Sequence, residues 1–319
     1  MKIAVLALEG VFDSGIAIVL DALTTANELA KVGGIQTPGF EIVVVGVQPQ
    51  VRSALGFQIP VVDAADVVNP DWVMVPAIGY KMPETLVPAL ARADIPDAAA
   101  ALRRWASQGA RVAAACVGTF VLAESGLLDE QEATTTWWLT PLFRQRYPQV
   151  RLDANRIIVP SGNLLTAGAA FSHIDLALWL IRHHSPELAA MVAKYLVVDS
   201  RPSQSSYMIA DHLAHADPLV EGFDRWARDR LDGTITLDAA ASALATSKRT
   251  LSRRMHAVLG KSPLEYVQDL RVERAVHLLK TSNHSVDRIA ALVGYADGVT
   301  LRTLLRKRLG RGVRELRVQ

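Results

Sequence analysis

The feature that most constrains the fold is a unit that occurs twice near the C-terminus, in Leu237–Pro263 and again in Val286–Val313. When the copies are offset by fifty positions, several residues coincide: Leu251 with Leu301, Leu259 with Leu309, Gly260 with Gly310 and Glu265 with Glu315. An internal repeat defines the structural unit before any single helix is assigned, so it outweighs local propensity. This part of the chain is therefore expected to fold as two copies of one small motif.

Each copy has the pattern of a helix, a short turn and a second helix. In the first copy Asp238 is a candidate N-cap for a helix with Ala240, Ala241 and Leu244 on one face, and Thr246 and Ser247 interrupt it. The second helices carry apolar side chains four residues apart, a spacing that makes a buried stripe. These stripes are Leu251, Met255 and Leu259 in the first copy and Leu301, Leu305 and Leu309 in the second.

The second helix of each copy, about 247–259 and 298–309, has basic and hydroxyl side chains opposite its stripe. Arg can form a bidentate pair with a guanine edge in the major groove, and Lys, Ser and Thr can hold phosphates. A helical bundle with a solvated charged face explains one such copy equally well, but two basic copies favour DNA binding. The predicted DNA contacts are Ser247, Lys248, Arg249, Ser252, Arg253, Arg302, Thr303 and Arg306.

The segments TSKRTLSRRMHAVLGKSPLEYVQDLRVERAVHLL and SVDRIAALVGYADGVTLRTLLRKRLG resemble the AraC/XylS-type DNA-binding domain, and the resemblance covers Leu219–Arg317. It implies that a long helix, about Pro263 to Leu279, joins the two helix-turn-helix units. The chain departs from the family in the second unit, where Leu301 and Leu305 replace Phe and Val313 replaces Pro. Leu in place of Phe keeps the stripe apolar.

Charge is distributed unevenly along the 319 residues, a length that suits two domains. Residues 234–319 contain 16 Lys and Arg against 7 Asp and Glu, whereas residues 1–233 are net acidic. A basic C-terminal third indicates a polyanion-binding module on a body that does not bind nucleic acid. The one cysteine excludes an intramolecular disulfide, and a cytoplasmic location is expected. No apolar run approaches the roughly twenty residues of a membrane span.

Strand-like runs alternate with helical ones over the first two hundred residues, which predicts an α/β domain with a parallel sheet sandwiched by helices. The segments AACVGTFVLAESGLLDEQEATTTWW, TAGAAFSHIDLALWLI and VVDSRPSQSSY resemble the ThiJ/PfpI-like domain of the class I glutamine-amidotransferase-like superfamily, with its flavodoxin-like fold. More narrowly, they resemble GlxA-type regulators, in which this domain precedes an AraC-type domain. The expected division is a sensor and dimerisation domain at 1–207, a linker at 208–218 and a DNA-binding domain at 219–317, with helix-turn-helix units at about 238–259 and 286–309.

Cys116 is the candidate nucleophile because it lies where a strand turns into a helix. Gly118 is expected to relax this turn, and the helix N-terminus is expected to favour a thiolate. The resemblance implies a backbone oxyanion site, including Gly79, and a histidine after the turn, but Thr136 stands in that place. It also implies a carboxylate on the first helix, where the chain has Gly15, with Asp13 close by.

A thiolate without a base to activate it is not a hydrolase, so the site is interpreted as an enzyme pocket retained for ligand binding. Its expected lining is Cys116, Val117, Gly79, Asp13, Gly15 and Thr136. The alternatives are a cysteine-dependent hydrolase or hydratase with a DNA-binding tail, and a cysteine that is a small buried residue. His212 and His215 share a helical face, but no carboxylate or cysteine completes a metal site.

The sequence therefore predicts a transcription regulator whose N-terminal domain is not an enzyme and senses a small metabolite. The GlxA resemblance implies an amine, amino acid or carboxylate as the effector. The expected partners are double-stranded promoter DNA, that effector, a second copy of the chain and RNA polymerase. No cofactor, metal or membrane partner is expected.

Overall fold

The computed structural model describes residues 1–199, 201, 203–204, 217–309 and 312–317. The chain divides into two compact units, Met1–Tyr207 and Met208–Gln319. Of the predicted linker, residues 208–216 lie outside the described residues, and so do His212 and His215. Asp217 and Pro218, the last two residues of the predicted linker, are described, and they open the first helix of the second unit.

The first unit is built on a seven-stranded sheet with the strand order β10-β11-β7-β6-β1-β2-β5. Only the β10–β11 pair is antiparallel among these strands. The strands are β1 (Lys2–Leu6), β2 (Glu41–Gly46), β5 (Val62–Asp63), β6 (Trp72–Val75), β7 (Arg111–Ala115), β10 (Ile158–Ser161) and β11 (Leu164–Ala167).

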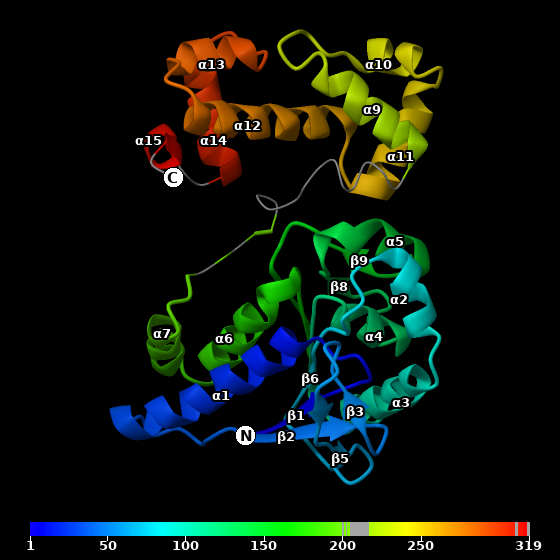
Figure 1. The fold of residues 1–319 in the computed structure, drawn as a ribbon, viewed down its shortest axis with the longest axis vertical. Coiled ribbons are helices and arrows are strands. Elements are labelled where there is room, and N and C mark those ends of the chain that lie inside the picture. The colour runs from blue at the N-terminus through cyan, green and yellow to red at the C-terminus, as the bar shows by residue number, and fades with distance from the viewer. Residues whose placement is uncertain (200, 202, 205–216, 310–311, 318–319) are drawn as a thin grey trace. The chain divides into compact units, whose positions relative to one another are not determined.

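Helices cover both faces of this sheet, as Figure 1 shows. Alternate residues of β1 point to opposite faces: Ile3 and Val5 belong to one core cluster, Ala4 and Leu6 to the other. The first cluster packs against α1 (Asp13–Gly33), α6 (His173–His184) and α7 (Pro186–Tyr195). The second packs against α2 (Pro83–Leu90), α3 (Asp94–Ser107), α4 (Gly118–Glu124) and α5 (Thr140–Arg146). The predicted α/β sandwich is confirmed.

Short elements that the sequence pattern did not predict complete this unit. They are the hairpin β3 (Val51–Arg52) and β4 (Gln58–Ile59), the parallel pair β8 (Glu132–Ala133) and β9 (Arg151–Leu152), and the 3-10 turns η1 (Trp137–Leu139) and η2 (Ala170–Ser172). Two-residue strands are too short for an alternation pattern, which has to continue over about four to eight residues to be recognised.

The second unit is helical over its described residues. Its helices are α9 (Pro218–Arg228), α10 (Leu237–Ala243), α11 (Lys248–Leu259), α12 (Pro263–Thr281), α13 (Val286–Leu292), α14 (Gly298–Leu309) and α15 (Val313–Arg317). Figure 1 shows α12 running between the group α9–α11 and the group α13–α15. The α10–α11 and α13–α14 pairs are the two repeats, and α12 is the long connecting helix that the family resemblance implies.

Helix caps set the limits of these elements. Asp217 caps α9 by accepting from the backbone N–H groups of Leu219 and Val220, with Pro218 at the first helical position. The prediction for α10 was wrong: Thr236 is its N-cap, and Asp238 lies inside the first turn. A hydroxyl and a carboxylate two residues apart are both good caps, so the sequence alone did not separate them.

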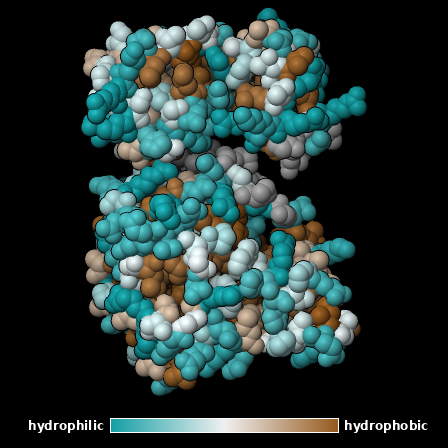
Figure 2. Space-filling model, turned by 180° about the vertical axis from the view of Figure 1, so that it is seen from behind, coloured by the Kyte–Doolittle hydropathy of each residue, from teal (hydrophilic) through white to brown (hydrophobic). Residues whose placement is uncertain are grey.

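The surface and the described helices bear on whether the protein could cross a membrane or hold a metal ion. On the face drawn in Figure 2, hydrophilic residues surround the hydrophobic ones that reach the surface. None of the helices described is both long and apolar enough to cross a membrane. Over the same residues, no group of three or more His, Cys, Asp or Glu side chains could hold a metal ion.

Candidate functional site

Helix α11 presents a basic surface because its other side is fixed in the core. Leu251 and Met255 are fully buried, which orients the opposite face outward. Arg249 and Arg253 are exposed on that face, and neither has an ion-pair or hydrogen-bond partner among the described residues. Ser252, which the sequence also assigns to DNA, is half-buried. Two guanidinium groups are therefore left to bind an anion or a base edge.

Other polar residues at the start of α11 are already used within the domain. Ser247 is the N-cap, accepts from the Thr250 backbone N–H and bonds the Thr250 hydroxyl at 3.0 Å. Lys248 Nζ lies 2.8 Å from Asp238 Oδ1 in an exposed ion pair. Arg254 pairs with the buried carboxylate of Asp217. Ser247 and Lys248 remain predicted DNA contacts, but each must share its polar group with the protein.

Helix α14 repeats this arrangement with a different cap. Asp297 accepts from the Thr300 backbone N–H at 2.7 Å, and Asp287 accepts from the Gly298 N–H at 2.9 Å. Leu301 and Leu305 are fully buried, and Leu309 is half-buried against the same core, so the predicted stripe is confirmed. Because the stripe is internal, the rest of α14 is turned toward solvent.

The outward residues of α14 differ in how many hydrogen-bonding groups they still have available for DNA. Arg302 and Arg306 are exposed and, over the described residues, have no hydrogen-bond or ion-pair partner. The Thr303 hydroxyl donates to the Val299 carbonyl oxygen at 3.0 Å, so it can accept a hydrogen bond from DNA but cannot donate its proton at the same time. The two arginines are therefore the stronger candidates.

In the first unit, Cys116 lies between the end of β7 and the start of α4. Its backbone has a φ of 55°, a left-handed conformation that is uncommon for any residue other than glycine. Its N–H donates to Ala167 O at 2.7 Å, and its carbonyl accepts from the Thr135 hydroxyl at 2.8 Å. These bonds hold the predicted sharp turn from strand to helix.

The role expected for Gly118 needs correction. Its backbone does not adopt a positive φ. A Cβ at this position would lie 2.3 Å from the Val75 carbonyl oxygen and 2.7 Å from that of Pro76. Gly118 is required because α4 starts in contact with the chain leaving β6, and the strain of the turn is at Cys116 itself.

The chemistry expected of Cys116 also needs correction. Burial raises the pKa of its thiol to about 12, and the nearby Val117 N–H, Thr136 hydroxyl and Lys81 charge lower that pKa by less. Loss of hydration therefore outweighs the helix N-terminus, and the group is a thiol at neutral pH. Over the described part of the chain, no histidine or carboxylate forms a hydrogen bond with its sulfur.

Gly79, the backbone donor expected in an oxyanion site, is used elsewhere. The Gly79 N–H donates to Gly10 O at 2.7 Å, and the Ala77 N–H donates to His173 Nε2 at 3.1 Å. Pro76, between β6 and these residues, has no N–H. The loop after β6 is thus bonded to its neighbours rather than open to a substrate.

His173 is the residue that the sequence analysis missed. It is fully buried, and its Nδ1 lies 2.7 Å from Ala170 O. Nε2 accepts from Ala77, so Nδ1 carries the proton and donates to Ala170. Burial lowers the pKa of His173 to about 4, which keeps the ring neutral.

The His173 ring fills the space in front of Gly15, where the resemblance implies a carboxylate. A Cβ on Gly15 would lie 2.7 Å from His173 Nε2, so the glycine and the histidine are complementary. Asp13, the nearby acid, is also engaged because its Oδ2 accepts from the Leu55 N–H at 3.0 Å. Neither position offers a base to Cys116.

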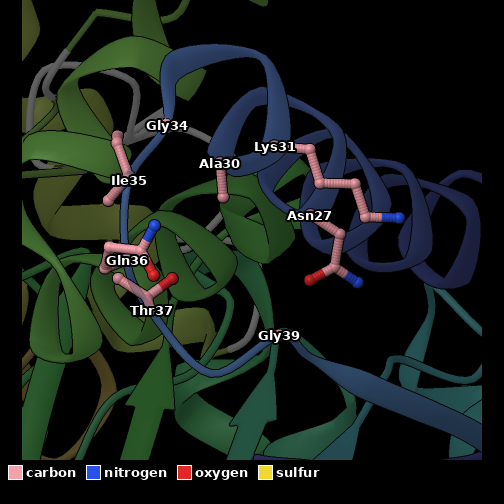
Figure 3. Close-up of a pocket in the computed structure, with 8 residues that line it drawn as sticks. All are labelled: Asn27, Ala30, Lys31, Gly34, Ile35, Gln36, Thr37 and Gly39. Carbon is pink, nitrogen blue, oxygen red and sulfur yellow. The ribbon is translucent and has the colours of Figure 1, made fainter.

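A surface pocket of about 420 Å³ lies elsewhere, at the end of α1 and along the loop that follows it (Figure 3). None of the residues predicted to line the ligand site borders this pocket. The Asn27 amide that faces it is paired in both directions with the Phe40 backbone, at 2.7 and 2.8 Å. The other polar side chains that line the pocket are those of Lys31, Gln36 and Thr37.

Gln204 is a second residue that sequence reasoning did not single out. It is fully buried, and its amide nitrogen donates to Thr135 O at 3.0 Å, while its backbone N–H donates to Asn155 O at 2.8 Å. Because the Thr135 hydroxyl bonds Cys116 O, Gln204 connects the sharp turn to the end of the first unit. The quoted segment VVDSRPSQSSY contained Gln204, but nothing in its spacing indicated a buried amide.

Comparison with known proteins agrees with this two-part organisation. Residues 1–183 match the DJ-1/PfpI family, and residues 240–319 match a helix-turn-helix domain. The crystal structure of an AraC family transcriptional regulator from Pseudomonas putida resembles this protein with a TM-score of 0.51, at 21% identity, over 61% of this chain and 98% of that one. At this identity the likeness concerns the fold alone.

Three curated relatives are HTH-type transcriptional regulators. GbdR of Pseudomonas aeruginosa is 27% identical over 61% of this chain and 54% of its own length. ArgR of the same species is 28% identical over 69% of this chain and 68% of its own length. GlxA of Rhizobium meliloti is 24% identical over 64% of this chain and 64% of its own length. The match to GbdR thus covers little more than half of that relative.

Proposed function

The chain belongs to the DJ-1/PfpI family, and because a helix-turn-helix domain follows that family's domain, we propose that it is a sequence-specific DNA-binding transcription regulator. The observation that carries this proposal is the pair of helices α11 and α14. Each is fixed by a buried apolar stripe and turns toward solvent two arginines that have no partner among the described residues. Such helices can enter two successive major grooves.

The test of DNA recognition is selection from a pool of random duplexes. Binding of the selected duplex is then compared with binding of a scrambled duplex at one fixed salt concentration. The expected ratio of affinities is about a thousandfold or more, as for other specific DNA-binding proteins. Equal affinity for both duplexes would contradict sequence-specific regulation.

For the N-terminal domain, the proposal is a sensor rather than an enzyme. A protonated, fully buried thiol whose sulfur bonds no histidine or carboxylate in the described residues lacks what a cysteine nucleophile needs. Iodoacetamide is expected to modify Cys116 much more slowly in the native protein than in denaturant at the same pH. Turnover of an amide or aldehyde substrate that disappears in Cys116→Ser would favour the alternative, a cysteine-dependent hydrolase or hydratase.

In this proposal a small metabolite acts as the effector by a population shift. It can change DNA binding only if it binds one arrangement of the protein more tightly than another. A thermal-shift screen of amines, amino acids and carboxylates on the full-length chain should find compounds that raise its midpoint. A screen in which no compound raises the midpoint would favour a DNA-binding architectural protein without an effector.

The remaining partners are part of the same proposal. A homodimer would offer paired recognition domains to paired half-sites, which are frequent for proteins with two-fold symmetry. RNA polymerase is the partner through which a bound regulator would act, and the cytoplasm is the expected compartment. Analytical ultracentrifugation tests the dimer, and a change in half-site spacing that leaves affinity unaltered would argue against it.

A further inference from the structure

Helix α14 exposes an apolar side chain at the end where recognition helices contact bases. Val299 is the second residue of α14, and it is 67% exposed. Leu301 and Leu305 already supply the buried stripe of this helix. Val299 therefore does not contribute to the core of its own domain.

The neighbours of Val299 make it part of a mixed surface. Arg302 is exposed one turn further along the helix, and the Thr303 hydroxyl is bonded to the Val299 carbonyl oxygen. An isopropyl group beside a guanidinium group suits the major groove, where apolar methyl groups and hydrogen-bond acceptors alternate.

The first repeat has a different residue at the same position. With the fifty-residue offset that superimposes Leu251 on Leu301, Val299 corresponds to Arg249, which is exposed at the start of α11. Arg pairs with the O6 and N7 acceptors of guanine, whereas Val has no hydrogen-bonding group. Val can make only an apolar contact, and in the major groove the thymine 5-methyl group provides one.

We infer that Val299 is a specificity-determining residue that contacts the 5-methyl group of a thymine, so that the second unit selects thymine where the first selects guanine through Arg249. This inference rests on the proposed function, because it requires α14 to enter the major groove. The contact buries about one methyl group, which corresponds to roughly a fourfold change in affinity.

The test uses the duplex selected by the full-length protein and replaces each thymine in turn by uracil, which lacks only the methyl group. One uracil is expected to weaken wild-type binding about fourfold. Val299→Ser should bind the thymine and uracil duplexes equally. The matched control is Leu264→Ser, which changes a half-exposed apolar residue at the second position of α12 and should keep the full thymine preference.

A second variant should change which base the protein prefers at the same base pair. Val299→Arg reproduces the residue of the first unit and should shift the preference at that position from thymine to guanine. Val299 is exposed, so both variants should unfold at the wild-type midpoint.

The outcomes separate this inference from the proposed function. Specific binding that no uracil weakens, or a uracil effect that persists in Val299→Ser, would overturn the inference alone. Binding of selected and scrambled duplexes with equal affinity would overturn the proposed function, and the inference would fail with it.

Discussion

The turn around Cys116 and the outward faces of α11 and α14 use their polar groups in opposite ways. At the turn, the Gly79 and Ala77 N–H groups, the Asp13 carboxylate and the His173 ring all bond other parts of the protein. On the two helices, arginines are exposed without partners among the described residues.

This contrast shows where the molecule retains capacity to bind. A site must hold groups whose hydrogen-bonding or charge requirements the protein itself leaves unmet, because a satisfied buried group gains little from a ligand. By this measure the DNA-binding helices are ready for a partner as they stand. Around Cys116 the groups named above are already bonded, and the buried Thr119 and Thr136 hydroxyls are the polar groups that have no hydrogen-bond partner among the described residues, so a ligand there would find few groups to bind.

The largest expected effect is on DNA affinity. Arg253→Ala and Arg302→Ala should each weaken specific binding by about 1–3 kcal/mol if the arginine contacts a base. The double variant should approach the sum, since the residues lie on separate helices. Electrophoretic mobility shifts on the selected duplex give these values.

The matched control for that experiment is Arg225→Ala. Arg225 is an exposed arginine of α9 that pairs with Glu221 one turn away and belongs to neither repeat. Its loss should leave specific binding nearly unchanged. An equal loss in all three variants would mean that net charge alone governs binding.

The next effect tests the complementarity of Gly15 and His173. His173→Ala removes two buried hydrogen bonds and leaves a cavity, which should lower the free energy of unfolding by about 3 kcal/mol. Gly15→Ala alone should also destabilise the protein, because its Cβ would meet the ring at 2.7 Å. Denaturant unfolding measures both.

Combining the two substitutions sharpens this test. In the double variant the new methyl group occupies space that the ring has left, so the loss should be smaller than the sum of the single losses. Strict additivity would mean that the two positions do not share this space.

A smaller effect concerns pH. Burial lowers the pKa of His173 from 6.5 to about 4, so below pH 6.5 the unfolded chain takes up a proton that the folded chain excludes until about pH 4. The free energy of unfolding should therefore fall as the pH decreases through this window, by up to about 1.4 kcal/mol per pH unit. His173→Ala should lose this part of the slope in unfolding followed by tryptophan fluorescence. An unchanged slope would mean that His173 takes up its proton over the same pH range in the folded and the unfolded protein.

The smallest effect concerns the ion pair at the start of α11. Lys248 and Asp238 are both exposed, so their pairing contributes about 0–1 kcal/mol to stability. Asp238→Asn should release Lys248 and remove a negative charge facing DNA, which should raise affinity slightly and make it more sensitive to salt. An affinity that falls in this variant would show that Asp238 itself has a role in binding.

The sequence predicted the parts of the fold that repeat or alternate. The offset repeat located α11 and α14, and their apolar stripes lie where the four-residue spacing placed them. The alternation of strand and helix patterns similarly predicted the parallel sheet sandwiched by helices, to which β1, β6 and β7 belong. These features are periodic along the chain, so neighbouring residues carry the information.

The features that could not be predicted depend on contacts between distant residues. His173 meets Gly15 and Ala77 only after α6 has packed on α1, and no local pattern indicates that meeting. The pKa of Cys116 depends on how completely folding removes water from its sulfur, which the position of a helix start does not reveal. The ion pair between Asp238 and Lys248 was not predicted either, because the sequence pattern assigned Asp238 as the N-cap of α10. Thr236 is the N-cap, which leaves Asp238 to pair with Lys248.

The central claim is that one chain binds DNA through both repeats, and guanine-methylation interference tests it most directly. Two patches of interference are expected per bound chain, about one helical turn (10–10.5 base pairs) apart on one face of the duplex. Arg253→Ala should remove one patch and Arg302→Ala the other. A single patch, or two patches that fade equally in both variants, would contradict the claim.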